Sequence, residues 1–455
     1  MTYQRPVRSP LAENPWIDGL IDGYRWGTTE ASPSIGYTFI SSTADEPRGL
    51  FAGYPSWGWT DDERALMLDA IAAIEAVCGL RFVDRGDDND DDVEIWFYNL
   101  DDESADGAFG FTYTPGSGSD EGLVAINWSA YRDEDGTARH PIAPGSFYGI
   151  TYLHELSHAV GLKHPHDLGI QGQPRFPDLT RRSNIYRDSG RYGQNAQPWT
   201  QLTYVDKKAR NGAVPTGEEA FGFLQTPGAL DVAALQWLYG INTEAAAGDD
   251  VYRLPTENAE GLGWQSIWDS GGRDRIDGSR ASDSVTIDLR NATLDLSDDA
   301  GGYLSRVEGV FAGFTIAHDW DGRVVGESAG LCIIEDATGG SGDDVLIGNT
   351  ASNVLKGRRG DDVLYAGESG SDRVKGGAGR DQFWISSHSE GFVTVLDFEP
   401  EADRLVFDDS LQDVELKDHR RGTNVLVSGD RVALIANVEG LSLSDHALAE
   451  LFSVL

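Results

Sequence analysis

Residues Thr151 to His164, TYLHELSHAVGLKH, contain three histidines and one glutamate at a spacing that sets the expectations for the whole chain. On a helix, His154 and His158 project from one face, about 5–6 Å apart at their Cβ atoms. Gly161 is the residue type that best adopts the left-handed conformation at a helix end, so His164 can turn back toward the pair. The stretch therefore predicts a metal site made of three histidines.

The predicted helix covers residues 152–160. Three neutral imidazoles leave one coordination position open, which is typical of a catalytic rather than a structural zinc ion. Glu155 is then predicted to be the general base that removes a proton from the attacking water. The H-E-x-x-H-x-x-G-x-x-H pattern fixes five positions and is rare by chance in a chain with nine histidines. The competing interpretation is a solvated helix face whose histidines bind no metal.

The charge balance of the chain is unusual. Its 455 residues carry 36 basic and 75 acidic side chains, which gives a net charge of −39. That excess argues against nucleic acid or an anionic membrane as a partner. Bound cations would offset the self-repulsion, and oxygen ligands suit Ca²⁺, so the acidity suggests calcium-binding loops. The length favours two or three domains.

The chain contains only two cysteines, Cys78 and Cys332, and we expect both to be buried apolar side chains rather than a disulfide. Residues 1–13 are polar and contain proline, so they do not have the pattern of a signal peptide. No apolar run is long enough to span a membrane, and no membrane anchor is predicted. If the protein leaves the cell, we expect a different export route.

The N-terminal half has the pattern of an α+β layer arrangement. Residues 14–26 place apolar side chains at helical spacing, and Thr60 is the expected N-cap of a helix that ends near Gly79. Strands are predicted at residues 36–40, 81–84, 93–99, 107–115 and 122–128. The fourth resembles an edge strand, to which an extended substrate peptide could add. The acidic stretch 85–92 is more typical of a solvated turn than of a calcium site.

Residues 165–200 are rich in Gly, Pro, Arg and Asn and are expected to form a loop over the cleft. His166 and Asp167 lie in this loop, and a supporting role beside the third histidine is favoured over direct metal ligation. A second helix is predicted from Thr226 as N-cap, with Pro227 in its first turn.

Glycine and aspartate then return with a period of nine residues. The chain reads GGSGDDVLI from Gly339, GNTASNVLK from Gly348, GRRGDDVLY from Gly357, GESGSDRVK from Gly367 and GGAGRDQFW from Gly376, with Ala366 as one extra residue. In such repeats the glycine-rich half forms a turn whose carbonyls and aspartate bind Ca²⁺, and the other half forms a short strand. An apolar residue stays in phase throughout, which a flexible linker would not require. A parallel β-roll or β-sandwich is predicted.

A degenerate pair of repeats precedes these five, DSGGRDRID from Asp269 and GSRASDSVT from Gly278. The predicted calcium ligands are Asp269, Gly271, Asp274, Asp283, Gly340, Gly342, Asp344, Asn353, Gly357, Gly360, Asp362, Asp372, Gly377, Gly379, Asp381 and Asp397. Residues 391–408 are expected to add strands that close the roll. Residues 244–249 are the predicted boundary, which divides the chain into a first domain over 1–245 and a second over 246–455.

Both halves together resemble the serralysins, a family of secreted bacterial zinc metalloproteases of the metzincin clan. The matching segments are NPWIDGL (14–20), HELSHAVGLKHP (154–165), WDSGGRD (268–274), the nonapeptides and LDFEPEADRL (396–405). The resemblance implies a metzincin-like endopeptidase domain with one catalytic Zn²⁺, followed by a domain that holds several structural Ca²⁺ ions. It also implies an extracellular protein exported by a type I secretion system that reads an uncleaved C-terminal signal, for which Glu450 and the apolar residues after it are suitable.

The resemblance further implies a monomer that acts on protein or peptide substrates and can be bound by a proteinaceous inhibitor. In the family, a methionine turn under the zinc precedes a tyrosine that can ligate zinc and stabilise the tetrahedral intermediate. Here Leu202 stands in place of the methionine and Tyr204 matches the tyrosine, although Tyr204 could instead be an ordinary core residue. Leucine roughly conserves the volume of methionine, a change that usually costs less than about 1.5 kcal/mol.

Leu202 and the long loop before it motivate one competing function, a catalytically impaired relative that acts as a calcium-dependent binding or surface protein. A second and weaker alternative is that the β-roll is an independent adhesin and the first half a passenger domain. The intact Glu155 and the three histidines favour the protease.

Overall fold

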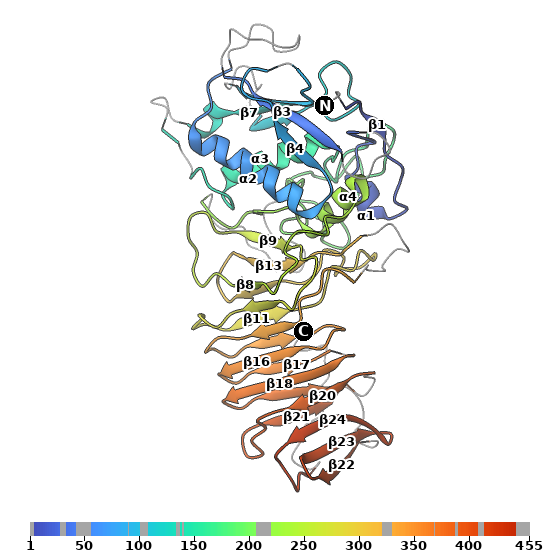
Figure 1. Ribbon diagram of the computed structural model, residues 1–455, viewed down its shortest axis with the longest axis vertical. Coiled ribbons are helices and arrows are strands. Elements are labelled where there is room, and N and C mark those ends of the chain that lie inside the picture. The colour runs from blue at the N-terminus through green and yellow to red at the C-terminus, as the bar shows by residue number, and fades with distance from the viewer. Residues whose placement is uncertain are drawn as a thin grey trace.

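The computed structural model describes residues 4–27, 33–41, 56–89, 91–100, 108–132, 137–138, 141–205, 220–320, 330–367, 369–386, 390–407 and 414–442. Within these ranges the molecule is elongated, with helices and a mixed sheet at one end and stacked strands along the remainder (Figure 1). No helix in the described ranges is long and apolar enough to cross a membrane. The predicted C-terminal signal around Glu450 lies outside them.

A five-stranded sheet with the order β4-β3-β5-β7-β6 forms the N-terminal part. Its strands are β3 (Ser34–Phe39), β4 (Arg81–Asp84), β5 (Ile95–Leu100), β6 (Gly110–Thr112) and β7 (Leu123–Asn127). The edge strand β6 is antiparallel to β7, and the other pairs are parallel. The five predicted strands and the edge position of the fourth are thereby confirmed, although β6 is shorter than expected. A separate pair, β1 (Val7–Arg8) and β2 (Tyr24–Arg25), lies near the N-terminus.

Helix α2 (Asp61–Val77) packs beside the sheet and begins as predicted at Thr60. The Thr60 hydroxyl accepts a hydrogen bond from the Glu63 backbone N–H, and the Glu63 carboxylate accepts one from the Thr60 N–H. This capping box satisfies two of the free donors at a helix start. Glu63 is fully buried and also accepts from Tyr148 on the neighbouring helix (2.9 Å), so the cap fixes how the two helices meet.

Helix α3 (Phe147–Ala159) carries the first two histidines of the motif and is longer than predicted. It starts five residues earlier than expected because the Ser146 hydroxyl accepts from the Gly149 N–H at 2.9 Å and caps the helix there. Its end is as predicted: Gly161 has φ +101°, and a Cβ at this position would lie 2.4 Å from the Tyr24 carbonyl oxygen. Only glycine fits this turn.

Helices α1 (Pro15–Leu20) and α4 (Ala229–Tyr239) complete the first half. The predicted start of α4 was wrong, since Gly228 rather than Thr226 is the N-cap. The reason is the carboxylate of Asp231, which accepts from the Gly228 N–H at 3.0 Å and so sets the first turn. Helix α1 is shorter than the predicted amphipathic segment and has Asn14 as its N-cap.

The C-terminal half consists of two long sheets. The first has the order β22-β23-β24-β20-β18-β16-β14-β10-β8, and the second β21-β19-β17-β15-β11-β12-β13-β9. The strands are β8 (Val251–Arg253), β9 (Trp264–Ile267), β10 (Arg275–Asp277), β11 (Val285–Asp288), β12 (Ser305–Val307), β13 (Gly313–Ile316), β14 (Asp336–Thr338), β15 (Val345–Ile347), β16 (Val354–Arg359), β17 (Val363–Tyr365), β18 (Ser371–Ala378), β19 (Gln382–Ile385), β20 (Phe392–Val395), β21 (Arg404–Phe407), β22 (Val414–His419), β23 (Gly422–Val427) and β24 (Asp430–Ala436). Successive strands from β14 to β21 alternate between the two sheets (Figure 1).

The repeats pair in parallel with their apolar positions aligned. Leu346 of β15 is in register with Leu364 of β17, which is in register with Phe383 of β19. In the other sheet, Leu355 of β16 faces Val374 of β18. All five side chains are buried, which confirms that the apolar residue of each repeat points inward. Burial of each such side chain contributes roughly 1.5–3 kcal/mol to folding.

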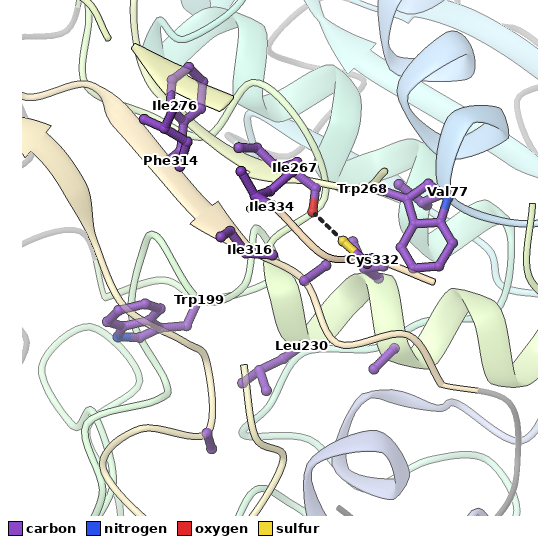
Figure 2. Close-up of a cluster of buried hydrophobic side chains, with 14 of the residues drawn as sticks. Val77, Trp199, Leu230, Ile267, Trp268, Ile276, Phe314, Ile316, Cys332 and Ile334 are labelled. Atoms are coloured by element: carbon purple, nitrogen blue, oxygen red, sulfur yellow. Dashed lines mark hydrogen bonds between the residues drawn. The ribbon is translucent and has the colours of Figure 1, made fainter. Parts of the chain in front are cut away.

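The two halves share one continuous hydrophobic core. Figure 2 shows Val77 of α2 and Leu230 of α4 in the same cluster as Ile267, Trp268 and Cys332 of the second half. The Cys332 thiol lies 3.6 Å from the Ile267 carbonyl oxygen (Figure 2). Cys332 and Cys78 are both free and buried, as expected.

Candidate metal centre

The three motif histidines converge on a single point. His154 and His158 extend from α3, and the turn at Gly161 brings His164 back toward them. The Nε2 atoms of each pair of these histidines are 3.1 Å apart. An equilateral triangle of that side has its centre about 1.8 Å from each corner, close to the zinc to nitrogen distance of about 2.0–2.1 Å.

The opposite ring nitrogens fix the protonation of these imidazoles. Nδ1 of His154 lies 2.8 Å from the Gln201 carbonyl, Nδ1 of His158 lies 2.8 Å from the Leu162 carbonyl, and Nδ1 of His164 lies 2.8 Å from an Asp167 carboxylate oxygen. Because these oxygens only accept, each Nδ1 carries the proton and each Nε2 presents its lone pair to the common centre. Burial lowers the pKa of His154 to about 3 and that of His158 well below its ordinary value, so both rings are neutral. This donor set fits one zinc ion.

Glu155 faces the same cleft and is 5% exposed. The Thr112 hydroxyl on edge strand β6 donates to its Oε2 at 2.8 Å. A Cβ at Gly110 would lie 2.8 Å from the other carboxylate oxygen, so β6 can approach this closely only because residue 110 is glycine. Without a cation beside it, burial raises the pKa of Glu155 to about 8. A positive ion held by the histidines would favour the carboxylate form that a general base needs. The sequence interpretation missed Thr112 and Gly110, and the glycine-rich pattern of β6 was the available signal.

Tyr204 lies beside the histidines, with its ring centroid 4.6 Å from that of His164 and 5.9 Å from that of His154. The Tyr204 ring also stacks on the Tyr186 ring, with the centroids 5.7 Å apart. Burial raises the pKa of Tyr204, and the negative charge of Glu155 adds to the rise. Leu202, two residues earlier, is fully buried in the core. The loop therefore places Tyr204 at the site.

Gln201 connects this loop to the metal centre and was not recognised in the sequence. Its carbonyl accepts from His154, and its side-chain amide donates to the Ser157 hydroxyl at 2.9 Å. Its backbone N–H donates to the buried carboxylate of Asp231 at 2.9 Å. Helix α4 thereby helps to orient a histidine of α3.

Asp167 acts on His164 through the Nδ1 contact described above, as favoured for this loop residue. The His166 ring stacks on the His164 ring at 4.9 Å and 7°. His164, His166 and Asp167 also form a group close enough to hold a metal ion. Asp167, however, is already bound to His164, so the three-histidine triangle is the better-formed site.

A cleft of about 450 Å³ opens beside Glu155 and His154. Its other lining residues are mostly apolar or aromatic: Ala108, Phe109, Gly110, Phe147, Ile150, Thr151, Tyr186, Gln197, Gln201, Thr203, Tyr204 and Phe223. Apolar walls with a few polar groups are typical of a ligand-binding pocket.

The first predicted calcium turn is brought together around three aspartates. One carboxylate oxygen each from Asp250, Asp269 and Asp274 lies within 4.8 Å of the others. Asp269 accepts from the Gly271 N–H at 2.9 Å, so the turn folds around this carboxylate. The second oxygen of Asp274 is buried and has no hydrogen-bond partner among the described residues. Asp250 was missed because it lies outside the repeat period.

The later turns form a ladder of carboxylates. Val285 N–H donates to Asp344 (2.8 Å), Asp344 N–H to Asp362 (2.9 Å), Asp362 N–H to Asp381 (3.0 Å), Asn353 N–H to Asp372 (2.8 Å) and Gly376 N–H to Asp397 (3.1 Å). Gly360, Gly377 and Gly379 have positive φ, as the tight turns require. The Gly340 N–H donates to the Asp344 carboxylate. A Cβ at Gly342 would lie 2.7 Å from the carbonyl carbon of Asp283, and a Cβ at Gly357 would lie 2.1 Å from Asp362 Oδ2. Asp283 itself is exposed and lies outside the ladder.

Comparison with known proteins shows what the chain is similar to. Residues 230–418 match the family model described as Peptidase M10 serralysin C terminal. The chain is 29% identical to metallopeptidase AprA of Pseudomonas marginalis over 335 residues, which cover 70% of this chain and 61% of that protein. It is also 29% identical to serralysin of Photorhabdus luminescens over 355 residues, 74% of this chain and 63% of that protein. The alignments thus span less than two thirds of these relatives.

Among solved structures, high choriolytic enzyme 1, a hatching enzyme zinc-protease from Oryzias latipes, aligns with 47% of this chain and 93% of its own. Its identity of 13% and TM-score of 0.24 are too low to carry an argument. The chain thus combines a helix-borne histidine triangle with a repeat-bearing second half. Part of that second half matches the serralysin C-terminal family model, and the chain is similar to the serralysin and the metallopeptidase named above.

Proposed function

We propose that the chain is a zinc-dependent endopeptidase that hydrolyses peptide bonds of protein substrates. The observation that supports this most strongly is the triangle of Nε2 atoms of His154, His158 and His164, 3.1 Å apart, which would hold the ion. When bound, zinc would supply a Lewis acid that polarises the scissile carbonyl and activates water. The relatives named above include a serralysin and a metallopeptidase, which supports the same class of activity.

Glu155 is the proposed general base. The hydrogen bond from Thr112 holds its carboxylate on one side of the cleft, where it can accept a proton from the attacking water and return it to the leaving amine. Tyr204 is the proposed donor to the oxygen that becomes negative in the transition state. Its raised pKa keeps the phenol protonated at neutral pH, so the hydroxyl can donate.

The substrate is proposed to bind as an extended strand along β6, one of the two edge strands of the N-terminal sheet. One side chain of the peptide would enter the cleft beside Phe109, Phe147 and Phe223. These aromatic walls favour a large apolar side chain.

The second half is proposed to be a calcium-stabilised domain over residues 246–455, joined to a catalytic domain over residues 1–245. The parallel turns, their buried aspartates and the unpartnered Asp274 oxygen support this assignment. Because Ca²⁺ would bind only the folded turns, it would stabilise them by mass action. We further propose that the protein is secreted by a type I system and acts as an extracellular monomer.

The test combines metal analysis with a casein assay and a peptide-library cleavage assay on the parent, on Glu155→Ala and on Glu257→Ala, which changes an exposed glutamate of the second half. Loss of a general base should reduce the rate about 10²–10⁴-fold while zinc remains bound. Glu257→Ala should match the parent. Full activity of Glu155→Ala would refute the proposed role, and a zinc-loaded parent that cleaves nothing would favour the impaired binding protein instead.

A further inference from the structure

Arg358 stands where the repeat pattern calls for glycine. It is the second residue of GRRGDDVLY, and the equivalent residues of the neighbouring repeats in the same sheet are Gly340 and Gly377. Its φ is +93°, in the left-handed region that L side chains rarely adopt. Glycine would take this conformation without strain. The arginine therefore requires a compensating contact.

The side chain supplies that contact. The Arg358 guanidinium donates to the Ser279 carbonyl oxygen at 2.7 Å and to the Gly340 carbonyl oxygen at 3.3 Å. Asp277 pairs with Thr338, and Thr338 pairs with Lys356. Ser279 and Gly340 therefore occupy, in the two preceding turns of the same sheet, the position that Arg358 occupies in its own turn. Backbone carbonyls of such turns are the oxygens that a calcium ion uses as ligands. The guanidinium thus lies against oxygens that would otherwise face a metal ion.

Two buried carboxylates lie in the turns around Arg358. Asp344 closes the turn at Gly340 by accepting a hydrogen bond from the Gly340 N–H, and Arg358 donates to the carbonyl of the same glycine. Asp362, in the same nonapeptide as Arg358, is fully buried, and its Oδ2 has no hydrogen-bond partner among the described residues.

The surroundings of Arg358 also disfavour a divalent cation. A surface hollow of about 380 Å³ is lined by Arg358 together with Lys356, Arg359 and Lys375, and it reaches Gly340. Lys356 and Lys375 face each other in register on adjacent strands. The positive charges of these side chains repel a metal cation.

We propose that Arg358 is a built-in substitute for calcium, whose guanidinium bridges the turns at Ser279 and Gly340 so that this position binds no metal ion. The inference rests on the calcium binding proposed above for other turns. It predicts that one turn pair of the second half is held together by the chain itself and is insensitive to chelators.

The experiment counts calcium ions on the full-length protein after chelator treatment, by isothermal titration with CaCl₂ and by equilibrium dialysis. Arg358→Gly should bind one more ion per chain than the parent, because it vacates the two carbonyls. Arg359→Gly is the matched control, since it removes the same charge from the same turn, and it should bind the parental number. Arg358→Lys keeps a cation at the site and should also bind the parental number.

The outcomes separate the two proposals. A parent that binds no calcium would refute the calcium sites themselves. A parent that binds calcium, with an unchanged count in Arg358→Gly, would overturn only the role of Arg358. An Arg358→Gly protein that stays unfolded in excess calcium would also overturn it, because calcium should then replace the guanidinium. If Arg358→Gly and Arg359→Gly both bind one additional ion, the gain comes from the change in net charge. That result would also refute the proposal that Arg358 takes the place of calcium.

Discussion

Asp231 of α4 supports the metal centre through the loop that contains Gln201. Its replacement by alanine should lower both the stability of the fold and the affinity for zinc. The side chain is fully buried. It accepts from the Thr200 hydroxyl at 2.6 Å, from the Gln201 N–H at 2.9 Å and from the Gly228 N–H at 3.0 Å. Gln201 in turn holds Nδ1 of His154.

The three hydrogen bonds that Asp231→Ala removes contribute unequally to the free energy of unfolding. Gly228 N–H keeps a second acceptor in the Gln201 side chain at 3.0 Å, and the Thr200 hydroxyl can rotate. Only the Gln201 N–H becomes a buried donor without a partner, which costs about 1–3 kcal/mol. The small cavity adds about 1 kcal/mol, so Asp231→Ala should lower the free energy of unfolding by about 2–4 kcal/mol. Asp231→Asn keeps an acceptor for Gln201 and should cost less than about 1.5 kcal/mol.

Asp231→Ala should also lower the zinc affinity more than Asp231→Asn does. Loss of a group that orients a metal-binding histidine typically weakens binding 10–100-fold, so Asp231→Ala should bind zinc about ten times more weakly than the parent. The assay is competition with a chromophoric chelator, together with urea unfolding of the zinc-loaded proteins followed by circular dichroism. Equal stability and equal zinc affinity of Asp231→Ala and Asp231→Asn would refute this reasoning, because they differ in the acceptor that Gln201 needs.

Three further outcomes follow from features of the site and the repeats. Leu202→Met should change stability by less than about 1.5 kcal/mol and leave zinc content unchanged, as measured by thermal unfolding and metal analysis, because the buried volume is nearly the same. Phe223→Trp should narrow the cleft and shift peptide-library cleavage toward smaller side chains; an unchanged preference would place the substrate elsewhere. In chelator, the second half should unfold first and lose stability as pH rises from about 4 to about 8. Burial raises the pKa of Asp274 to about 7 and that of Asp362 to about 8, and carboxyls with raised folded-state pKa destabilise the fold as they ionise. Calcium should remove this slope in melting curves across pH, and a flat profile without calcium would contradict it.

Local patterns in the sequence predicted the parts of the molecule that local interactions determine. The helix after Thr60 begins where a capping box can form, and the turn at Gly161 occurs where only glycine fits. The apolar residues of the repeats are buried because each repeat places one of them in its strand, in register with the strand two repeats away.

The misplaced and missed residues depend on partners far away in the chain. The start of α4 is set by Asp231, which also serves the loop around Gln201, and no local pattern around Thr226 reveals that. Thr112 reaches Glu155 only through the packing of β6 against α3. Asp250 joins Asp274 because parallel pairing places β8 beside β10.

The alternation of the repeats between two sheets restricts how the second half can change in length during evolution. Asp336 pairs with Val354 and Val354 with Arg373, so each strand finds its partner two repeats away rather than one. Insertion or deletion of a single nonapeptide would exchange the two sheets for every later strand and would misalign the antiparallel end formed by β22–β24. A change by two repeats would add or remove one complete coil and leave the downstream pairing intact. Gain and loss of repeats in such chains should therefore proceed in pairs.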